Sequence, residues 1–337
     1  MRRTLVILVI ICQVLVLAFM AGKREYISLT GKNIILRTAP IDPRDLFRGD
    51  YVRLRYEISS IPFHKATPEL MERFRKDRAG TTVYASLSVG EDGVAEAVSL
   101  SLEKPQGLFI KGEFPSAGDS LSSGAGMTIK YGIESYFVQQ GEGLVMEKMR
   151  GSRNTVQVPL EMEVALANDG TAVIKNHRWS PIGIGIEMLL TRQTGTPPRA
   201  KSAKFRITFK NASTQPMALV SMPGYCSLTL EPVSVEMEQT IQIPDKPFCA
   251  GLKPTANDVF MVQPDSSGFV DIDLSEPEWL VNFQGKLVES GELHWQKRFR
   301  IVYHPPSAVN CGQLESAKLI WHGRITTAAF HGRGNID

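Results

Sequence analysis

The stretch RGDYVRLRYEI, from Arg48 to Ile58, decides the fold of the first half of this chain. Its apolar and polar side chains alternate, so that Val52, Leu54, Tyr56 and Ile58 share one face. Alternation with a period of two is typical of a strand that is buried on one face. The glycine just before the strand can take the positive φ with which a chain leaves a turn. The pattern therefore predicts a turn followed by a half-buried strand.

The residues that lead into this strand carry the signals of one helical turn. In the segment APIDPRD, Asp42 fits an N-cap, Pro43 the first helical position and Asp45 the third. A competing interpretation takes Asp42, Asp45 and Asp50 as oxygen ligands of a hard cation. Capping and turn chemistry already explain these carboxylates, and they lack the alternating spacing of a calcium loop. We therefore favour an architectural role and predict no metal site and no cofactor.

Four arginines make the same region the most basic part of the chain, namely Arg44, Arg48, Arg53 and Arg55. Guanidinium groups bind phosphate and carboxylate with two hydrogen bonds, so these residues could receive an anionic headgroup or an acidic partner. Arg53 and Arg55 also fit the solvated face of an ordinary strand, which is the interpretation that we favour.

The amino terminus predicts a membrane anchor. Residues from Thr4 to Ala21 carry no charge, and eighteen helical residues span ~27 Å, enough to cross a thin bilayer core. Signal peptidase cleavage needs small residues at the −1 and −3 positions, whereas a cut after Ala21 places Phe19 at −3. We therefore expect an uncleaved anchor over residues 1–22. The amino terminus then stays inside, and the rest of the chain is exported from the cytoplasmic membrane on a single span.

Composition sets the size and broad class of the remainder. The chain has 337 residues, of which 43% are hydrophobic and 22% charged, enough for two cores. Its net charge of +3 is spread along the length, so we expect no nucleic-acid partner. The six histidines lack the close spacing of a zinc motif. In an oxidising compartment Cys226 and Cys249 could form a disulfide, although the odd cysteine Cys311 leaves other pairings open.

Strand and turn patterns predict a mainly β protein in two parts. A β-rich domain over residues 23–190 contains hairpins at the GEDG and NDG turns and a short helix within TPELMERFRKDRAG. The proline-containing segment 191–203 is predicted to be a linker. Many short strands follow in residues 204–337, which predicts an immunoglobulin-like β-sandwich.

A second block, YGIESYFVQQGEG from Tyr131 to Gly143, completes a resemblance to the bacterial GDYXXLXY family, which is named after the first block. The resemblance covers about residues 25–180. It implies an amino-terminal membrane segment, an exported domain and a gene placed near those of multi-pass membrane proteins, but no particular activity. Where the family has a Pro-Glu pair, this chain has Gln139 and Gln140. The motif residues are Asp42, Pro43, Arg44, Gly49, Asp50, Tyr51, Leu54, Tyr56, Tyr131, Gly132, Glu134, Tyr136 and Phe137.

Two functions remain open from the sequence. The first is a non-enzymatic envelope protein, anchored by one helix, that binds another membrane or envelope protein such as a multi-pass protein. The second is an enzyme or small-ligand receptor with a pocket between the two blocks, in which Asp50 and Glu134 supply acidic groups and residues 113–126 form a lid. Aromatic residues such as Tyr136 more often fill a β-rich core than line a pocket. We expect the first.

Overall fold

The three-dimensional structure of the chain is a computed structural model. It describes residues 2–39, 51–76, 79–115, 127–139, 142, 146, 149, 151, 155–190, 193–194, 199–200, 203–233, 240–294 and 297–334. Five motif residues lie outside this described part, namely Asp42, Pro43, Arg44, Gly49 and Asp50. The helical turn predicted over residues 42–46 and most of the predicted lid lie outside it as well.

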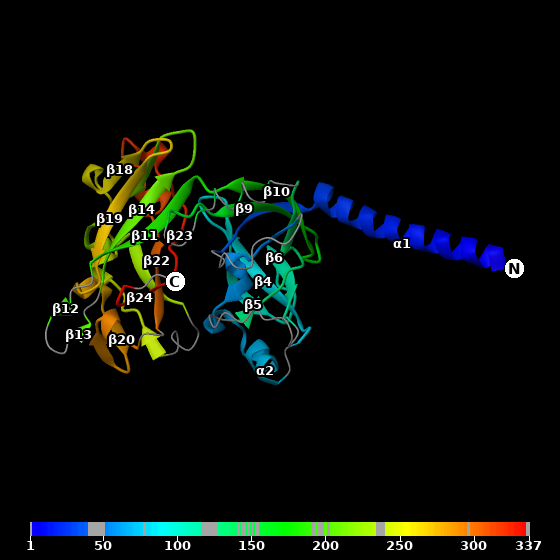
Figure 1. Cartoon of the computed structure of the whole chain (residues 1–337), viewed down its shortest axis with the longest axis horizontal. Helices are drawn as coiled ribbons and strands as arrows, with labels where there is room; N and C mark the ends of the chain where they lie inside the picture. The colour runs from blue at the N-terminus through cyan, green and yellow to red at the C-terminus, as the bar shows by residue number, and fades with distance from the viewer. Residues whose placement is uncertain are drawn as a thin grey trace.

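A single long helix, α1 (Arg2–Thr30), projects from the rest of the protein (Figure 1). Apolar side chains from Leu5 to Met20 are exposed along it. Among the described residues, this is the one helix that is long and apolar enough to cross a membrane. The helix continues to Thr30, beyond the end at Gly22 that the sequence predicted, because residues 23–30 contain neither glycine nor proline to stop it.

The end of α1 is packed onto the first sheet without an intervening loop. Ile27 is buried in a small apolar cluster with Ala165 and Val173. The next residue after the helix, Gly31, donates its N–H to the carbonyl of Ile27 at 2.8 Å. A Cβ atom at Gly31 would lie 2.5 Å from that oxygen and 2.9 Å from the carbonyl oxygen of Leu166, so the close approach requires glycine. The helix and the sheet are therefore held as one unit.

The first domain, residues 31–180, contains two three-stranded antiparallel sheets and two short ribbons. One sheet has the order β1-β9-β10 and the other β5-β4-β6, while β2 pairs with β8 and β3 with β7. The bounds are β1 (Lys32–Arg37), β2 (Tyr51–Arg53), β3 (Ser60–Ile61), β4 (Thr82–Val89), β5 (Ala95–Ser101), β6 (Phe109–Glu113), β7 (Met127–Thr128), β8 (Ser135–Phe137), β9 (Leu160–Leu166), β10 (Ala172–Trp179), α2 (Pro68–Lys76), η2 (Glu57–Ser59) and η3 (Phe63–Lys65). Both predicted hairpins, β4–β5 and β9–β10, are present, and α2 is the predicted short helix.

The strand that the opening motif predicted is shorter than its alternation suggests. All four residues of the predicted inner face, Val52, Leu54, Tyr56 and Ile58, are buried. The ladder with β8 nevertheless ends at Arg53, Tyr56 forms one isolated bridge with Thr38, and a 3-10 turn, η2, begins at Glu57. The alternation therefore predicted burial correctly, whereas the length of a strand also depends on its partner.

The second domain, residues 181–334, is built from sheets with the orders β11-β14-β19, β16-β22-β23 with β24 also paired to β22, and β17-β20-β21, and from the ribbons β15–β18 and β12–β13. The bounds are β11 (Ile182–Leu190), β12 (Gln193–Thr194), β13 (Arg199–Ala200), β14 (Lys204–Asn211), β15 (Met217–Val220), β16 (Leu228–Pro232), β17 (Ile241–Gln242), β18 (Val259–Val262), β19 (Ser267–Asp273), β20 (Val281–Phe283), β21 (Lys286–Val288), β22 (Arg298–Tyr303), β23 (Ile325–Thr326), β24 (Phe330–His331), α5 (Ala308–Cys311), η4 (Pro223–Tyr225), η5 (Pro247–Cys249), η6 (Ala256–Asp258), η7 (Pro277–Trp279), η8 (Ser290–Glu292) and η9 (Ala317–Leu319).

Two sheets of this domain share one core. Alternate residues of β11 and β14, including Ile184 and Ile207, pack in the same cluster as Leu230 of β16 and Ile301 of β22. Figure 1 shows β22 alongside β11 and β14. This sandwich-like arrangement confirms the predicted β-sandwich class. The immunoglobulin-like topology stays a prediction.

The boundary between the two hydrophobic cores lies between β10 and β11, one strand before the linker predicted at residues 191–203. β10 ends at Trp179 in the first domain, whereas β11 pairs along its length with β14 and contributes Ile182, Ile184 and Ile186 to the second core. Within the predicted linker, the described residues of β12 and β13 pair with each other.

Candidate functional site

The described parts of the two motif blocks, residues 51–58 and 131–139, lie side by side. β2 of the first block pairs antiparallel with β8 of the second, with Tyr51 opposite Phe137. Past the end of β2, the N–H of Leu54 donates to the carbonyl oxygen of Glu134 at 2.7 Å. The described parts of the blocks are therefore in direct backbone contact.

Two tyrosines fix the blocks to each other reciprocally. The hydroxyl of Tyr56, in the first block, donates to the carbonyl of Ile133 in the second at 2.8 Å. The hydroxyl of Tyr131, in the second block, donates to the carbonyl of Ile58 in the first at 2.7 Å. Burial raises the pKa of both tyrosines, and the nearby Glu134 carboxylate raises it further. Both hydroxyls therefore stay protonated and act as hydrogen-bond donors.

The remaining residues of the second block shape its turn. Gly132 has a φ of +77°, in the left-handed region that favours glycine. Glu134 accepts a hydrogen bond from the N–H of Tyr131 at 2.5 Å. This carboxylate, which the sequence offered as an acidic group for a pocket, thus closes a local turn.

The ribbon of β2 and β8 has a buried and an exposed face. On the inner side, the hydroxyl of Tyr136 lies 3.0 Å from Nδ1 of His177 in β10. On the outer side, Arg53 and Ser135 are exposed and lie opposite each other, and Phe137 is 76% exposed. The motif therefore holds an exposed surface of mixed polarity, defined by Arg53, Ser135 and Phe137, which we call the ribbon surface.

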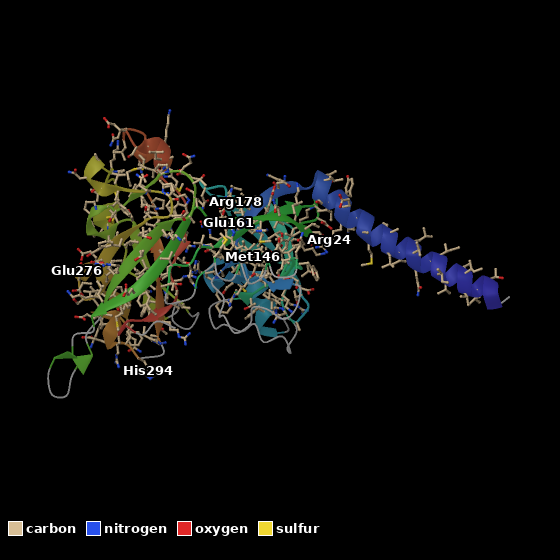
Figure 2. All side chains as sticks on the ribbon, turned by 45° about the horizontal axis from the view of Figure 1, so that its top comes forward. Arg24, Met146, Glu161, Arg178, Glu276 and His294 are labelled. Atoms are coloured by element: carbon tan, nitrogen blue, oxygen red, sulfur yellow. A yellow bond between two sulfur atoms is a disulfide. The ribbon has the colours of Figure 1, made fainter. Side chains whose placement is uncertain are left out.

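A buried ion cluster joins the first domain to the second. The Arg37 guanidinium, on β1, binds Glu161 of β9 and Asp92, each at 2.7 Å, and donates to the main-chain carbonyl of Arg324 in the second domain. Arg178 of β10 binds the other oxygen of Glu161 at 2.7 Å. Figure 2 labels Glu161 and Arg178 close together, on the side of the first domain that faces the second.

The cluster continues into the second domain through the side chain of Arg324. That guanidinium donates to Glu231 of β16 at 2.9 Å, and Arg300 of β22 binds the same carboxylate at 2.8 Å. Beside it, burial lowers the pKa of His304 to about 4, and the positive charge of Arg324 contributes to this shift. His304 is therefore neutral near pH 7.

The GEDG turn of the first domain forms a second contact between the domains. A carboxylate oxygen of Glu91 accepts the N–H of Ala308 at 2.9 Å. Nδ1 of His322 lies 3.5 Å from the same oxygen and 3.0 Å from the carbonyl oxygen of Pro306. The hairpin turn is thus bonded to the segment that contains α5.

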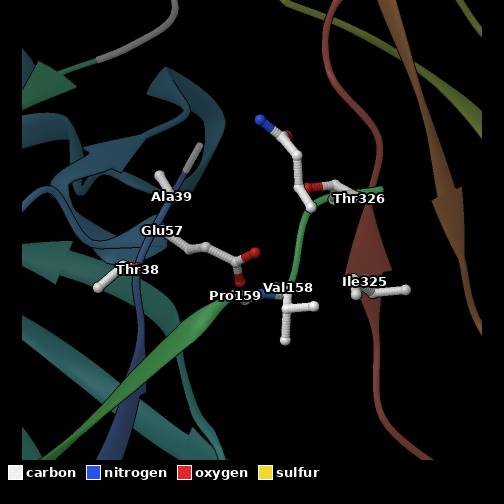
Figure 3. Close-up of a pocket in the computed structure, with 8 residues that line it drawn as sticks. Thr38, Ala39, Glu57, Val158, Pro159, Ile325 and Thr326 are labelled. Atoms are coloured by element: carbon white, nitrogen blue, oxygen red, sulfur yellow. The ribbon is translucent and has the colours of Figure 1, made fainter. Parts of the chain in front are cut away.

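A small cavity lies between the two domains, beside the ion cluster. Its lining includes Thr38, Glu57 and Gln157 from the first domain and Ile325 and Thr326 from the second. Figure 3 shows the Glu57 side chain reaching into it. Burial raises the pKa of this carboxyl, whereas the charges of Arg37 and Arg324 oppose the rise. The space is large enough for a water molecule but too small for a larger ligand.

The sequence did not predict this domain interface. Glu161 follows the pattern of an ordinary strand, since its neighbours Leu160 and Met162 are buried in the first core. Its partner Arg37 is 124 residues away, and no local signal links the two. Alternation of charged with apolar residues is typical of a strand with one solvated face, so no sequence pattern indicated that the second domain covers β9.

The cysteines and candidate metal ligands can also be placed. Cys226 and Cys249 form a disulfide with Cα atoms 5.5 Å apart, and Cys311 is a buried free thiol. Within the described part of the chain, no group of three or more histidine, cysteine, aspartate or glutamate side chains is placed to hold a metal ion.

These features define a β-rich, two-domain protein on one long apolar helix. The model of the GDYXXLXY protein family matches residues 13–176. The match confirms the resemblance carried by the two blocks over this part of the chain. The second domain lies outside the match. No curated protein and no solved structure matches the chain significantly.

Proposed function

We propose that the protein is a single-pass envelope protein whose exported body binds another membrane protein, of which a multi-pass protein is the expected kind. In this arrangement α1 lies in the cytoplasmic membrane, and both β-rich domains lie on its outer side. The proposed role is binding, as an accessory subunit, and not catalysis.

The observation that carries the proposal is the rigid join between α1 and the first sheet. Ile27 is 4% exposed in its contact with the β9–β10 hairpin, and Gly31 leaves no room for a flexible linker. A helix fixed in this way holds the domain at a constant height and orientation above the bilayer. A partner in the same membrane would meet the same surface at every encounter, which lowers the ordering cost of binding.

The ion cluster between the domains supports the same role. Arg37 and Glu161 form a pair whose side chains are only 1% and 0% exposed, and their contacts extend into the second domain through Arg324. The second domain is thereby held on the first. A rigid body of two domains presents a larger fixed surface than either domain alone, which suits protein recognition.

The chemistry of the motif supports binding over catalysis. The hydroxyls of Tyr56 and Tyr131 donate to backbone carbonyls, and their pKa values are raised. Glu134 is engaged in a turn. These groups stabilise the ribbon and leave the exposed ribbon surface as the part of the motif that a partner can reach.

Photo-crosslinking in intact membranes tests the proposal. A photoreactive amino acid at Arg53 or Ser135, on the ribbon surface, should give a discrete crosslinked product that contains another membrane protein. The same group at Leu287 of β21, which is 62% exposed in the second domain, is the matched control.

Products that are equally abundant from all three positions, or that contain no second protein, would contradict binding through the ribbon surface. Protein that is released from membranes by alkaline carbonate would contradict the anchor itself.

A further inference from the structure

Positive charges gather where α1 meets the first domain. Lys23 and Arg24 are the first charged residues after the apolar run, and Lys32 begins β1, two residues after the end of the helix. All three are exposed. Figure 2 labels Arg24 near this end of the helix.

The β9–β10 turn and β6 bring further lysines to the same end of the domain. The N–H of Lys111, on β6, donates to the carbonyl of Gly170 in the turn at 2.9 Å. The pKa of Asp169, also in the turn, is lowered first by its hydrogen bond from Thr171 and further by the charges of Lys23 and Lys111. Lys23 of the helix and Lys111 of the sheet therefore share one neighbourhood.

Lys104 extends this neighbourhood. Its Nζ lies 5.4 Å from the centre of the Phe109 ring, and an added Cβ atom at Gly170 would lie 2.7 Å from Cε2 of the same ring. The exposed basic residues of this end form what we call the proximal surface, namely Lys23, Arg24, Lys32, Lys104 and Lys111. The exposed acidic residues near them are Glu25, Glu103, Glu113 and Asp169, so the five positive charges exceed the four negative ones.

The geometry of α1 sets the height of this surface above a bilayer. The apolar run ends near Gly22, and Ile27 is already packed on β9 and β10. At about 1.5 Å per residue, five residues place the sheet ~8 Å beyond the hydrocarbon core. A headgroup layer is roughly 5–8 Å thick. The proximal surface therefore lies at the level of the lipid headgroups.

We propose that the proximal surface binds anionic phospholipid headgroups of the leaflet from which α1 emerges. This inference rests on the proposed anchoring of α1 in the membrane. We assign a lipid bilayer as the binding partner because the proximal surface directly adjoins the helix that would span that bilayer. Lysines at this level attract anionic lipids by their charge, and the attraction fades within a Debye length. Binding of headgroups on this side would also limit rotation of the domain about the helix axis.

Energy transfer from the protein to labelled lipids tests the inference. The full-length chain with Cys12→Ala and Asn168→Cys takes a donor fluorophore in the β9–β10 turn, since Cys311 is buried. The protein is placed in phosphatidylcholine vesicles with a fraction of phosphatidylglycerol, and either lipid carries the acceptor on its headgroup at equal mole fraction. We expect transfer to labelled phosphatidylglycerol to exceed transfer to labelled phosphatidylcholine by about threefold.

Charge reversal identifies the residues responsible. Lys104→Glu with Lys111→Glu should remove the excess transfer, whereas Lys286→Glu with Lys318→Glu, at exposed lysines of the second domain, should keep it. Raising salt to about 0.5 M should remove the excess from the unaltered protein, which tests the inference even if a variant fails to fold.

Equal transfer to the two lipids, or an excess that survives the Lys104 and Lys111 reversals, would overturn the inference. Carbonate extraction of the same vesicles reports on the anchor separately. Protein that resists extraction but shows no preference for phosphatidylglycerol would leave the proposed function standing and remove only the headgroup site.

Discussion

Arg37 and Glu161 form an ion pair that is almost completely removed from solvent, with their closest nitrogen and oxygen atoms 2.7 Å apart and side-chain exposures of 1% and 0%. The pair lies between β1 and β9, and the same guanidinium reaches the main chain of Arg324 in the second domain. One buried cation thus serves both the first sheet and the contact between the domains.

Removing the negative partner should therefore destabilise the protein strongly. We expect Glu161→Gln to lower the free energy of unfolding by about 3 kcal/mol, because the charge of Arg37 stays buried with one carboxylate fewer. Urea unfolding of the full-length protein in detergent measures this. Asp271→Asn, in the exposed pair with Arg206, is the control and should cost less than about 1 kcal/mol. Similar losses of unfolding free energy in both variants would show that the buried pair contributes no more to stability than the exposed pair.

The motif tyrosines should contribute through their hydroxyl groups. Tyr56→Phe and Tyr131→Phe keep the rings in the core but leave the carbonyls of Ile133 and Ile58 without these donors. We expect each variant to lose about 1–2 kcal/mol, since a buried acceptor is left unsatisfied. Tyr84→Phe is the matched control, because the half-buried Tyr84 contacts Phe109 through its ring, which the substitution keeps. Unfolding midpoints for Tyr56→Phe and Tyr131→Phe that equal that of Tyr84→Phe would refute the reciprocal bonds.

The join between helix and sheet should tolerate no side chain at Gly31. An added Cβ would meet two backbone oxygens at 2.5 and 2.9 Å, so we expect Gly31→Ala to cost about 2 kcal/mol. At Gly22, within α1, an added Cβ atom would have no heavy atom within 4 Å. Gly22→Ala should be neutral or should stabilise the helix by up to about 1 kcal/mol. Thermal unfolding in detergent compares the two, and equal effects would argue against a fixed join.

Acid should weaken the second domain through His304. Its pKa is lowered from 6.5 to about 4 in the folded protein, so between these values the unfolded chain binds the proton and the folded chain does not. Stability from this group is complete above pH 6.5 and is lost as pH falls towards 4. We expect His304→Gln to flatten the decline in unfolding midpoint over this range. The exposed His64→Gln is the control, and a decline that is identical in the His304 variant would exclude His304 as its source.

The sequence predicted those parts of the fold that depend on neighbouring residues. The alternation at Val52, Leu54, Tyr56 and Ile58 predicted which side chains are buried, because strand faces follow from the spacing alone. The GEDG and NDG turns also predicted both hairpins, because a hairpin turn depends on a few consecutive residues. The apolar run predicted the helix, although not its continuation to Thr30.

These local patterns did not predict contacts between segments that are far apart in the sequence. Tyr56 and Ile133 are 77 residues apart, and no pattern in either block predicts the hydrogen bond between them. The strand β11 was placed in the wrong domain, because Pro197 and Pro198 look like a linker while the pairing of β11 with β14 is decided by the second core. The ion cluster at the interface was missed for the same reason.

If α1 spans a membrane, as we propose, the docking of Ile27 couples the tilt of the helix to the orientation of the whole body. Bilayers of different thickness change the tilt of a spanning helix, and here no loop absorbs that change. Each degree of tilt would swing the whole body by the same angle, and the strands farthest from α1 would travel the greatest distance. Membrane thickness would in this way set the direction in which the second domain points.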